Sequence, residues 1–147
     1  KLSHRLNYLV GDAHMLPFPN DSFVCATIGF GIRNFIDVPR ALREVVRVLK
    51  PSANVAILEI VPIAGNGVMA KIFPLYFRHI TPWIGALLAG DRQAYTYLPE
   101  SVEHFHSVTE LERLMKQSGL QITTSISIGL GTVAIIVGKK KVIKTTE

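Results

Sequence analysis

The stretch Gly11-Asp-Ala-His-Met-Leu-Pro-Phe-Pro19, followed by Phe23-Val-Cys-Ala-Thr-Ile-Gly-Phe-Gly31, decides the fold. The apolar runs Leu6 to Val10 and Phe23 to Ile28 lead into the two glycine-bearing segments, which predicts two strands that each end in a loop. Such loops line the ligand crevice at the carboxyl edge of an open α/β sheet. The glycine-rich turn and the ribose-binding acid that open such sheets are not in this sequence. We therefore expect the back half of a nucleotide-type binding domain.

Downstream of these strands, the sequence predicts a helix and a third strand. Asp37 is a suitable N-cap with Pro39 in the first turn, apolar residues then repeat at helical spacing, and Lys50-Pro51 stops the helix. The run Val55 to Val61 is nearly all apolar, which favours a central strand covered on both faces. Strand, helix and strand with short links predict a right-handed crossover and a parallel sheet.

The second half of the chain starts with a segment that breaks this alternation. Residues 62–105 contain four prolines and a cluster of aromatic residues, and we expect a helical insertion over the crevice. A capping box at Ser107-Val-Thr-Glu110 begins a helix that ends at Gly119. The runs Ile122 to Ile128 and Thr132 to Val137 are separated by a short turn, so they predict two antiparallel strands, the first at an exposed edge.

The composition fits one domain or a large part of one. The chain has 147 residues, of which 48% are hydrophobic, and its mean hydropathy of +0.31 argues against disorder. The net charge is +5, but the basic residues are spread out without a basic–aromatic ladder, so nucleic-acid binding is not expected. The lysine-rich tail from Lys139 to Lys144 is interpreted as a solvated end, with weak attraction to anionic lipid as the alternative.

The cysteine, the histidines and the apolar runs exclude further classes of protein and of site. The single cysteine, Cys25, lies in an apolar strand and is expected to be a small buried hydrophobe, while a disulfide framework is excluded. Lys1 to Arg5 is polar, so no signal peptide is expected, and no uncharged apolar run reaches the roughly 18 residues of a membrane span. The histidines lack metal-ligand spacing with acids, so no metal site is expected.

Four blocks together resemble the class I S-adenosylmethionine-dependent methyltransferases, and within them the UbiE-type C-methyltransferases of ubiquinone and menaquinone biosynthesis. The blocks are Gly11-Asp-Ala-His-Met-Leu-Pro-Phe18, Phe30-Gly-Ile-Arg-Asn-Phe35, Arg47-Val-Leu-Lys-Pro51 with Leu58-Glu59, and Pro82-Trp-Ile-Gly85 with Tyr95-Thr-Tyr-Leu-Pro-Glu-Ser101. The third block is shared by many small-molecule methyltransferases, whereas the second joined to the fourth is specific. The resemblance covers residues 7–139, nearly the whole chain.

The resemblance implies an incomplete Rossmann-like class I methyltransferase sheet, mostly parallel with an antiparallel last strand, plus the helical insertion. The chain is then the carboxyl-terminal part of one methyltransferase domain, and the G-x-G-x-G loop that holds the methionine end of the cofactor in this family is not in it. One departure concerns a turn. The family has Gly-Gly where this chain has Ser52-Ala53, which we expect to reduce the stability of that turn.

The implied activity is C-methylation of a demethylated prenyl quinol, either demethylmenaquinol or 2-methoxy-6-polyprenyl-benzoquinol, with S-adenosylmethionine as cofactor. The resemblance implies cofactor contacts at Gly11, Asp12, Ala13, Gly29 and Phe30, with the Asp12 carboxylate accepting from the exocyclic amine of adenine. The alternatives are a local Asx turn at Asp12 and a plain turn glycine at Gly29.

Three residues are candidates for catalysis. C-methylation of a quinol ring needs a carbon nucleophile, which forms when a phenol proton is lost. A cation near the oxygen would favour the phenolate, so Arg33, with Asn34 beside it, is a catalytic candidate whose alternative role is a surface salt bridge. Glu59 ends an apolar strand at the carboxyl edge and is either a third member of the site or the buried partner of an arginine.

The insertion supplies the candidate substrate contacts. His79, Tyr95 and Tyr97 are expected near the ring hydroxyls, unless they pack the lid itself. The apolar insertion fits a polyprenyl tail or a membrane-facing surface, so we expect a cytoplasmic protein peripheral at the inner membrane, with a homodimer left open. Two other functions stay in view: a non-catalytic remnant that binds a partner, and a methyltransferase for another small lipid.

Overall fold

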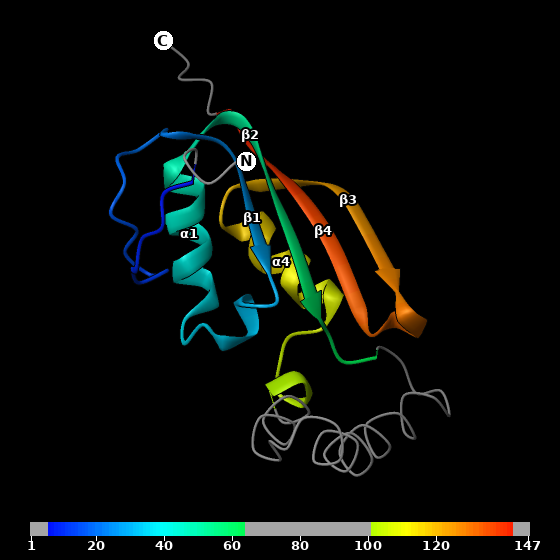
Figure 1. The fold of residues 1–147 in the computed structure, drawn as a ribbon. Coiled ribbons are helices and arrows are strands. Elements are labelled where there is room, and N and C mark those ends of the chain that lie inside the picture. The colour runs from blue at the N-terminus through cyan, green and yellow to red at the C-terminus, as the bar shows by residue number, and fades with distance from the viewer. Residues whose placement is uncertain (1–5, 64–100, 143–147) are drawn as a thin grey trace.

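The computed structural model describes residues 6–63 and 101–142, which form a sheet backed by helices (Figure 1). The elements in chain order are β1 (Phe23–Gly29), the 3-10 helix η2 (Ile32–Asn34), α1 (Val38–Val48), β2 (Leu49–Ile60), α4 (Val108–Gln117), β3 (Leu120–Ile128), the 3-10 helix η3 (Gly129–Gly131) and β4 (Val133–Lys140). The strand order is β1-β2-β4-β3, so the last strand lies inside the sheet between β2 and β3.

The strand pairings agree with the sequence-based topology. β1 and β2 are parallel and are connected through α1, while β4 is antiparallel to both β2 and β3. β2 is longer than expected because it begins at Leu49, directly after the helix. Ser52 lies within this early part of β2 and has a φ of 64°, the left-handed region in which glycine is favoured.

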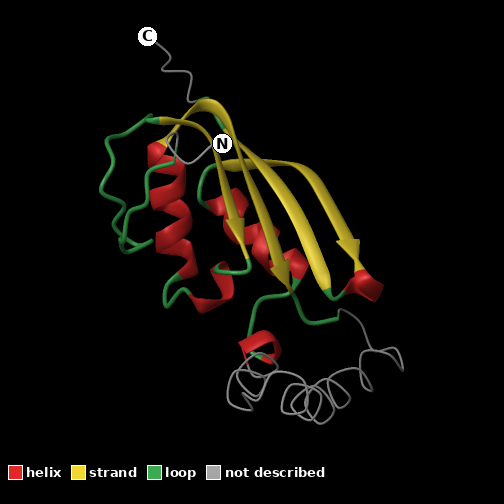
Figure 2. Cartoon of the chain, in the orientation of Figure 1, coloured by secondary structure: helices red, strands yellow, loops and turns green. Residues whose placement is uncertain are grey.

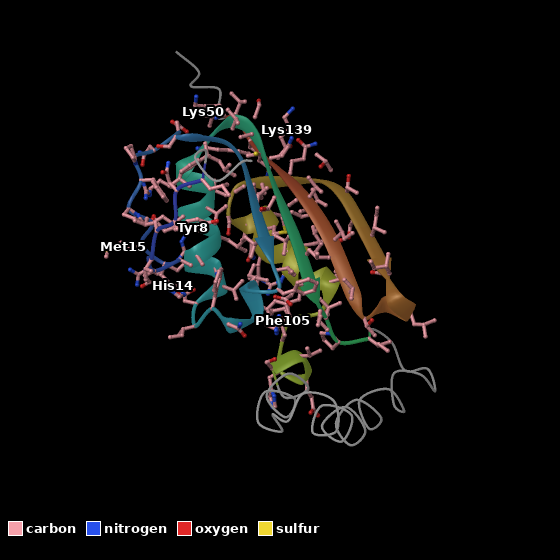
Figure 3. The ribbon with its side chains drawn as sticks, in the orientation of Figure 1. Tyr8, His14, Met15, Lys50, Phe105 and Lys139 are labelled. Atoms are coloured by element: carbon pink, nitrogen blue, oxygen red, sulfur yellow. The ribbon has the colours of Figure 1, made fainter. Side chains whose placement is uncertain are left out.

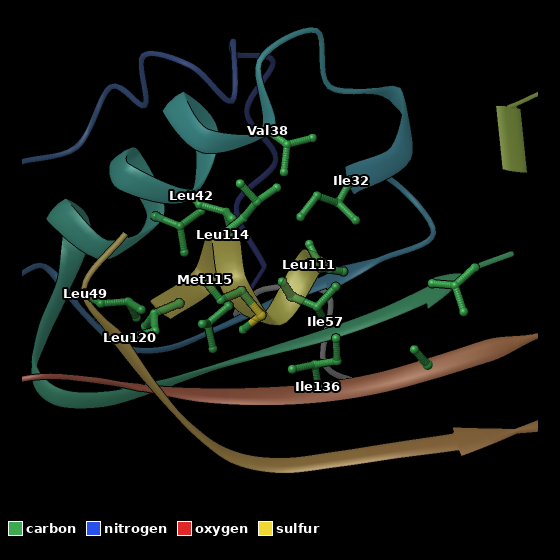
Figure 4. Close-up of a cluster of buried hydrophobic side chains, with 14 of the residues drawn as sticks. Ile32, Val38, Leu42, Leu49, Ile57, Leu111, Leu114, Met115, Leu120 and Ile136 are labelled. Carbon is green, nitrogen blue, oxygen red and sulfur yellow. The ribbon is translucent and has the colours of Figure 1, made fainter. Parts of the chain in front are cut away.

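The helices α1 and α4 lie on the same face of the sheet, and the core fills the space between (Figures 2 and 4). Both helices begin where the sequence places them, because the side chain of Asp37 accepts from the N–H of Arg40 and that of Ser107 accepts from the N–H of Glu110. The core residues buried to 1% exposure or less are Ile32, Ala41, Leu42, Leu49, Val55, Ile57, Val61, Leu111, Met115, Leu120, Ala134 and Ile136. The apolar residues that repeat at helical spacing in the sequence therefore form the buried faces of the two helices.

The predicted strand from Leu6 to Val10 is wrong. Residues 6–10 have no regular secondary structure, and the side chains of Tyr8 and Val10 are at least nine-tenths exposed. An apolar run forms a strand only when another strand satisfies its backbone groups, and none of the described strands pairs with this segment. Asp12 accordingly does not follow a strand, and its only ladder contact is an isolated bridge to Met15.

Two burial predictions also need correction. Cys25 is exposed rather than buried, because β1 is an edge strand that no described element covers on its free side. β2 is interior to the sheet, but the described helices cover only one of its faces. Val55, Ile57 and Glu59 are buried on that face, whereas Ala56, Leu58 and Ile60 are half-buried on the other.

The expected insertion at residues 62–105 falls mostly outside the described part of the chain. Residues 101–103 are helical and lead into the segment before α4. Among the helices of the described residues, none combines the length and the apolar character needed to cross a membrane.

Candidate functional site

The carboxyl ends of β1 and β2 meet at one edge of the sheet and bring two of the sequence blocks together. Gly29 is in register with Leu58, and the N–H of Phe30 donates to the carbonyl of Leu58 at 2.8 Å. The residues that follow on each strand, the 3-10 helix with Arg33 on one side and Glu59 on the other, are therefore neighbours. This is the arrangement expected for a ligand crevice in an open α/β sheet.

Arg33 and Glu59 form an ion pair in the interior. Nη1 of Arg33 lies 2.6 Å from Oε1 of Glu59, and the two side chains are 10% and 0% exposed. The backbone N–H of Arg33 donates to the other carboxylate oxygen at 3.2 Å, and the N–H of Ile60 donates to Oε1 at 2.8 Å. Four lone-pair sites of a buried carboxylate thus receive three donors, which offsets much of the cost of burying the charge.

The Arg33 side chain also donates hydrogen bonds to two further segments. Nη1 also donates to the carbonyl of Phe30 at 2.8 Å, and Nε donates to the hydroxyl of Ser101 at 3.3 Å. Within the described residues no hydrogen bond uses Nη2. Arg33 therefore ties together the end of β1, the end of β2 and the helical turn at residues 101–103. Asn34 sits in the same 3-10 helix, where its backbone N–H donates to Gly31.

The second part of the site is the loop that contains Asp12. The carboxylate of Asp12 accepts from the backbone N–H of His14 at 2.9 Å and contacts Nδ1 of the His14 ring at 2.6 Å. The backbone hydrogen bond, followed by the one from the ring, lowers the pKa of Asp12 below its usual value. The ring of His14 in turn accepts from the N–H of Asp37 at 3.1 Å, so this loop touches the start of α1. Figure 3 shows His14 and Met15 in this loop.

A second ion pair fastens the loop to α1 farther along. Arg47 donates through Nε and Nη2 to the two carboxylate oxygens of Glu44, and also to the carbonyls of Leu16 and Phe18. The N–H of Leu16 donates to Glu44 at 2.9 Å. The hydrogen bonds from Arg47 are the main reason that the pKa of Glu44 lies below its usual value, and they raise the pKa of Arg47. The conformation of the loop is thus set by its contacts with α1.

A cavity of about 400 Å³ lies between this loop, β1 and α1. Its lining is almost entirely apolar and consists of Ala13, Leu16, Phe18, Phe23, Cys25, Ala26, Thr27, Ile28, Phe35, Val45 and Val48. Among the expected cofactor contacts only Ala13 lines this cavity. Gly11 and Phe30 are exposed, and a Cβ at Gly29 would meet no atom within 4 Å. The surface beside Gly29 is therefore open to a close approach from outside the described residues.

The structure brings together some of the expected residues and leaves others outside its range. Arg33, Asn34, Glu59, Gly29 and Phe30 share one sheet edge, and Asp12 lies in a loop that contacts the start of α1. The expected substrate contacts His79, Tyr95 and Tyr97 lie outside the described residues. Over residues 6–63 and 101–142, no group of three or more His, Cys, Asp or Glu is placed to hold a metal ion.

Sequence reasoning missed two residues that the geometry places in the site. Ser101 is the last residue of the fourth sequence block and His14 lies in the first, and the sequence assigns no contact to either. Their partners lie 68 and 23 residues away along the chain, so no local spacing signals either contact. Glu44 and Arg47 are three residues apart on a helix, a spacing at which an ion pair could have been proposed.

Comparison with known proteins defines the class and then the family. A solved S-adenosylmethionine-dependent methyltransferase from Thermotoga maritima, described as a possible histamine N-methyltransferase, is similar with a TM-score of 0.62 over 90% of this chain and 63% of that chain, at 20% identity. At that identity the likeness shows the fold, which is that of the class I methyltransferases. The model of the ubiE/COQ5 methyltransferase family matches residues 1–140. The chain belongs to this family.

Two curated relatives show how far the likeness extends. The chain is 42% identical to a demethylmenaquinone methyltransferase of Deinococcus radiodurans over 131 residues, which is 89% of this chain and 54% of the relative. It is 38% identical to the mitochondrial 2-methoxy-6-polyprenyl-1,4-benzoquinol methylase of Pongo abelii over 135 residues, 92% of this chain and 41% of the relative. The chain thus spans about half the length of these relatives.

Proposed function

We propose that the full-length protein transfers a methyl group from S-adenosylmethionine to a ring carbon of a demethylated prenyl quinol. The substrate is demethylmenaquinol or 2-methoxy-6-polyprenyl-benzoquinol, the two ring types that the names of the relatives suggest. The observation that carries the proposal is the convergence of the second and third sequence blocks at the carboxyl edge of β1 and β2, where Arg33 meets Glu59.

Residues of this edge and of the Asp12 loop support the choice of cofactor. Gly29 has open space where a side chain would project, so a ligand can approach the backbone there. One oxygen of the Asp12 carboxylate is held by His14, and the other receives no hydrogen bond within the described residues, which leaves it able to accept from the adenine amine. Gly11, Ala13 and Phe30 complete the expected cofactor contacts. When bound, S-adenosylmethionine supplies the electrophilic methyl group.

Arg33 and Glu59 act on the acceptor ring in this proposal. The quinol becomes a carbon nucleophile as its hydroxyl proton passes to solvent water, and negative charge then develops on that oxygen. After the ring carbon has taken the methyl group, its hydrogen leaves to water as a proton and restores the aromatic ring. Because Glu59 neutralises the guanidinium at 2.6 Å, Arg33 offers hydrogen-bond donors rather than a net positive charge. Its Nη2 group is the candidate donor to the phenolate. Asn34, in the same 3-10 helix, is the second candidate contact.

Substrate contacts at His79, Tyr95 and Tyr97 stay predictions of the family resemblance. Peripheral contact with the inner membrane also stays a prediction, and the lysine tail gives it only partial support. Nζ of Lys140 lies 2.8 Å from the Asp21 carboxylate and 2.6 Å from the carbonyl of Leu49, so this lysine is already engaged.

Calorimetry with S-adenosylmethionine, together with methyl transfer to a short-tailed demethylated quinol, tests the proposal on the full-length protein. We expect binding and turnover there, and weak or no binding by the 147-residue chain alone. Asp12→Ala in the full-length protein should weaken cofactor binding, because the carboxylate that accepts from the adenine amine is lost. A folded full-length protein that binds no cofactor would instead favour the partner-binding alternative.

A further inference from the structure

His14 connects the Asp12 loop to Asp37, the N-cap residue of α1. Its ring contacts the Asp12 carboxylate through Nδ1 at 2.6 Å and the backbone N–H of Asp37 through Nε2 at 3.1 Å. The side chain of His14 is only 15% exposed, whereas that of Asp12 is 62% exposed. The ring also packs edge-on against Phe35, with the centroids 6.0 Å apart. The histidine is thus a largely buried bridge between Asp12 and Asp37, and the Asp12 side chain is exposed to solvent.

The two hydrogen bonds determine the protonation state of the ring. A backbone N–H can only donate, so Nε2 must carry a lone pair toward Asp37. A neutral imidazole has one proton, which then resides on Nδ1 and is donated to Asp12. His14 is therefore neutral in this arrangement and in the Nδ1–H tautomer. An imidazolium would present a second N–H to the N–H of Asp37, and that contact would be lost.

We propose that His14 is a positioning residue for the cofactor, which as the neutral Nδ1–H tautomer holds Asp12 against the start of α1. The inference rests on the proposed function, in which Asp12 accepts from the adenine amine. With one carboxylate oxygen occupied by His14, the other is kept in a fixed place for the ligand. Protonation of His14 frees the loop from Asp37 and so lowers the affinity for S-adenosylmethionine at acidic pH.

Three charged residues surround His14. Asp12 and Asp37 lie on either side of the ring, and Nε of Arg40 donates to the carbonyl of His14 at 3.2 Å. An imidazolium would keep its attraction to Asp12, so protonation breaks the bridge at Asp37 without detaching Asp12 from the ring. The expected loss is that of one ordinary hydrogen bond, roughly 3- to 10-fold in affinity.

The test combines a tautomer measurement with pH-dependent binding, both on the full-length protein. Nitrogen-15 NMR of the histidine side chains at pH 8 should show His14 protonated at Nδ1 and unprotonated at Nε2. Calorimetry with S-adenosylmethionine from pH 5.5 to 8.0 should show affinity falling as His14 takes up a proton. His14→Gln keeps an acceptor near the position of Nε2, and His14→Asn keeps a donor near the position of Nδ1.

Both variants should bind the cofactor roughly 3- to 10-fold more weakly than the parent at pH 8 and should lack the acidic decline. His106→Gln is the matched control, because His106 contacts Glu110 at 3.4 Å on the surface of α4, and it should retain the decline. A proton on Nε2 of His14, or an unchanged acidic decline in His14→Gln, overturns the inference. Failure of the proposed function looks different, because then the parent protein binds no cofactor at any pH.

Discussion

The guanidinium of Arg33 and the carboxylate of Glu59 are 2.6 Å apart, and Glu59 is completely buried. Arg33 comes from the loop after β1 and Glu59 from the end of β2, so the pair joins the two parallel strands at their carboxyl ends. The sequence suggested two roles for each residue, one in the site and one in a salt bridge. The geometry shows the salt bridge, and the role in the site stays a proposal, for which an arginine held by a buried carboxylate would be a fixed donor.

Arg33→Gln and Arg33→Lys should lower turnover far more than cofactor affinity in the full-length protein. A donor aimed at the developing phenolate acts in the transition state, and loss of one such donor costs roughly 100- to 1,000-fold in kcat. Lysine should recover part of the rate, since it keeps a charge for Glu59 but not the planar fork. Single-turnover methyl transfer, with cofactor binding measured separately, provides the comparison.

A double variant separates this chemistry from stability. Arg33→Ala alone leaves a buried carboxylate without its cation and should destabilise the fold by about 3–5 kcal/mol. Arg33→Met combined with Glu59→Leu removes both charges, and the stability measured by denaturant unfolding should largely return. Turnover should stay low. Wild-type turnover in a stable double variant would reduce Arg33 to a structural residue.

Two glycine-to-alanine substitutions should have different effects, one on stability and the other on cofactor binding. A Cβ at Gly138 would lie 3.0 Å from Cε of Met115 and 3.1 Å from Cβ of Leu120, so Gly138→Ala should destabilise the core by about 1–3 kcal/mol. Gly29→Ala meets no described atom within 4 Å and should leave stability within about 0.5 kcal/mol of the parent. In the full-length protein, however, Gly29→Ala should weaken cofactor binding. Thermal unfolding and calorimetry measure the two effects.

Ser52→Gly should stabilise the protein. Ser52 has a φ of 64°, and a residue with a Cβ is strained there by about 1–2 kcal/mol. Glycine relieves this strain, but its larger conformational entropy in the unfolded chain offsets part of the gain. A net gain of about 0.5–1 kcal/mol in the free energy of unfolding is expected. Ala53→Gly is the control, since the buried Ala53 has no positive φ, and it should lower stability. Equal effects at both positions would contradict the strain at Ser52.

The Glu44–Arg47 pair should make stability sensitive to acid. The pKa of Glu44 is lowered in the folded state from its usual 4.5, so the folded protein binds fewer protons at this site than the unfolded chain. The contribution is therefore complete above about pH 4.5 and disappears as the pH falls through the lowered value. Glu44→Gln should flatten stability over that acidic range.

Local features of the fold could be predicted from the sequence because their causes are local. Asp37 and Ser107 begin helices since each side chain accepts from an N–H three residues on. The antiparallel pairing of β3 and β4 follows from the short turn between them. The proximity of Arg33 and Glu59 could also be predicted from the sequence, because parallel strands place their carboxyl ends at the same edge of the sheet.

The remaining features depend on partners that are distant in the sequence. In the sequence, both the run Leu6 to Val10 and Cys25 stand among apolar residues, which predicts burial. Both are exposed in the structure, because burial depends on which other element covers a segment. His14 shows the same limit for the site. Its role depends on Asp37, which is placed beside it by the packing of the loop on α1.

β4 is the last of the described strands along the chain, but it lies in the interior of the sheet, so the middle of the sheet is completed last. β2 ends at Ile60, and the strand that occupies its second edge begins at Val133. Among the described strands β3 pairs only with β4, so it has no described partner until β4 is present. Among the described strands, the second edge of β2 therefore has no partner while about half of the 147 residues are synthesised. The long separation between paired strands makes sheet closure a late, slow folding step governed by loop-closure entropy.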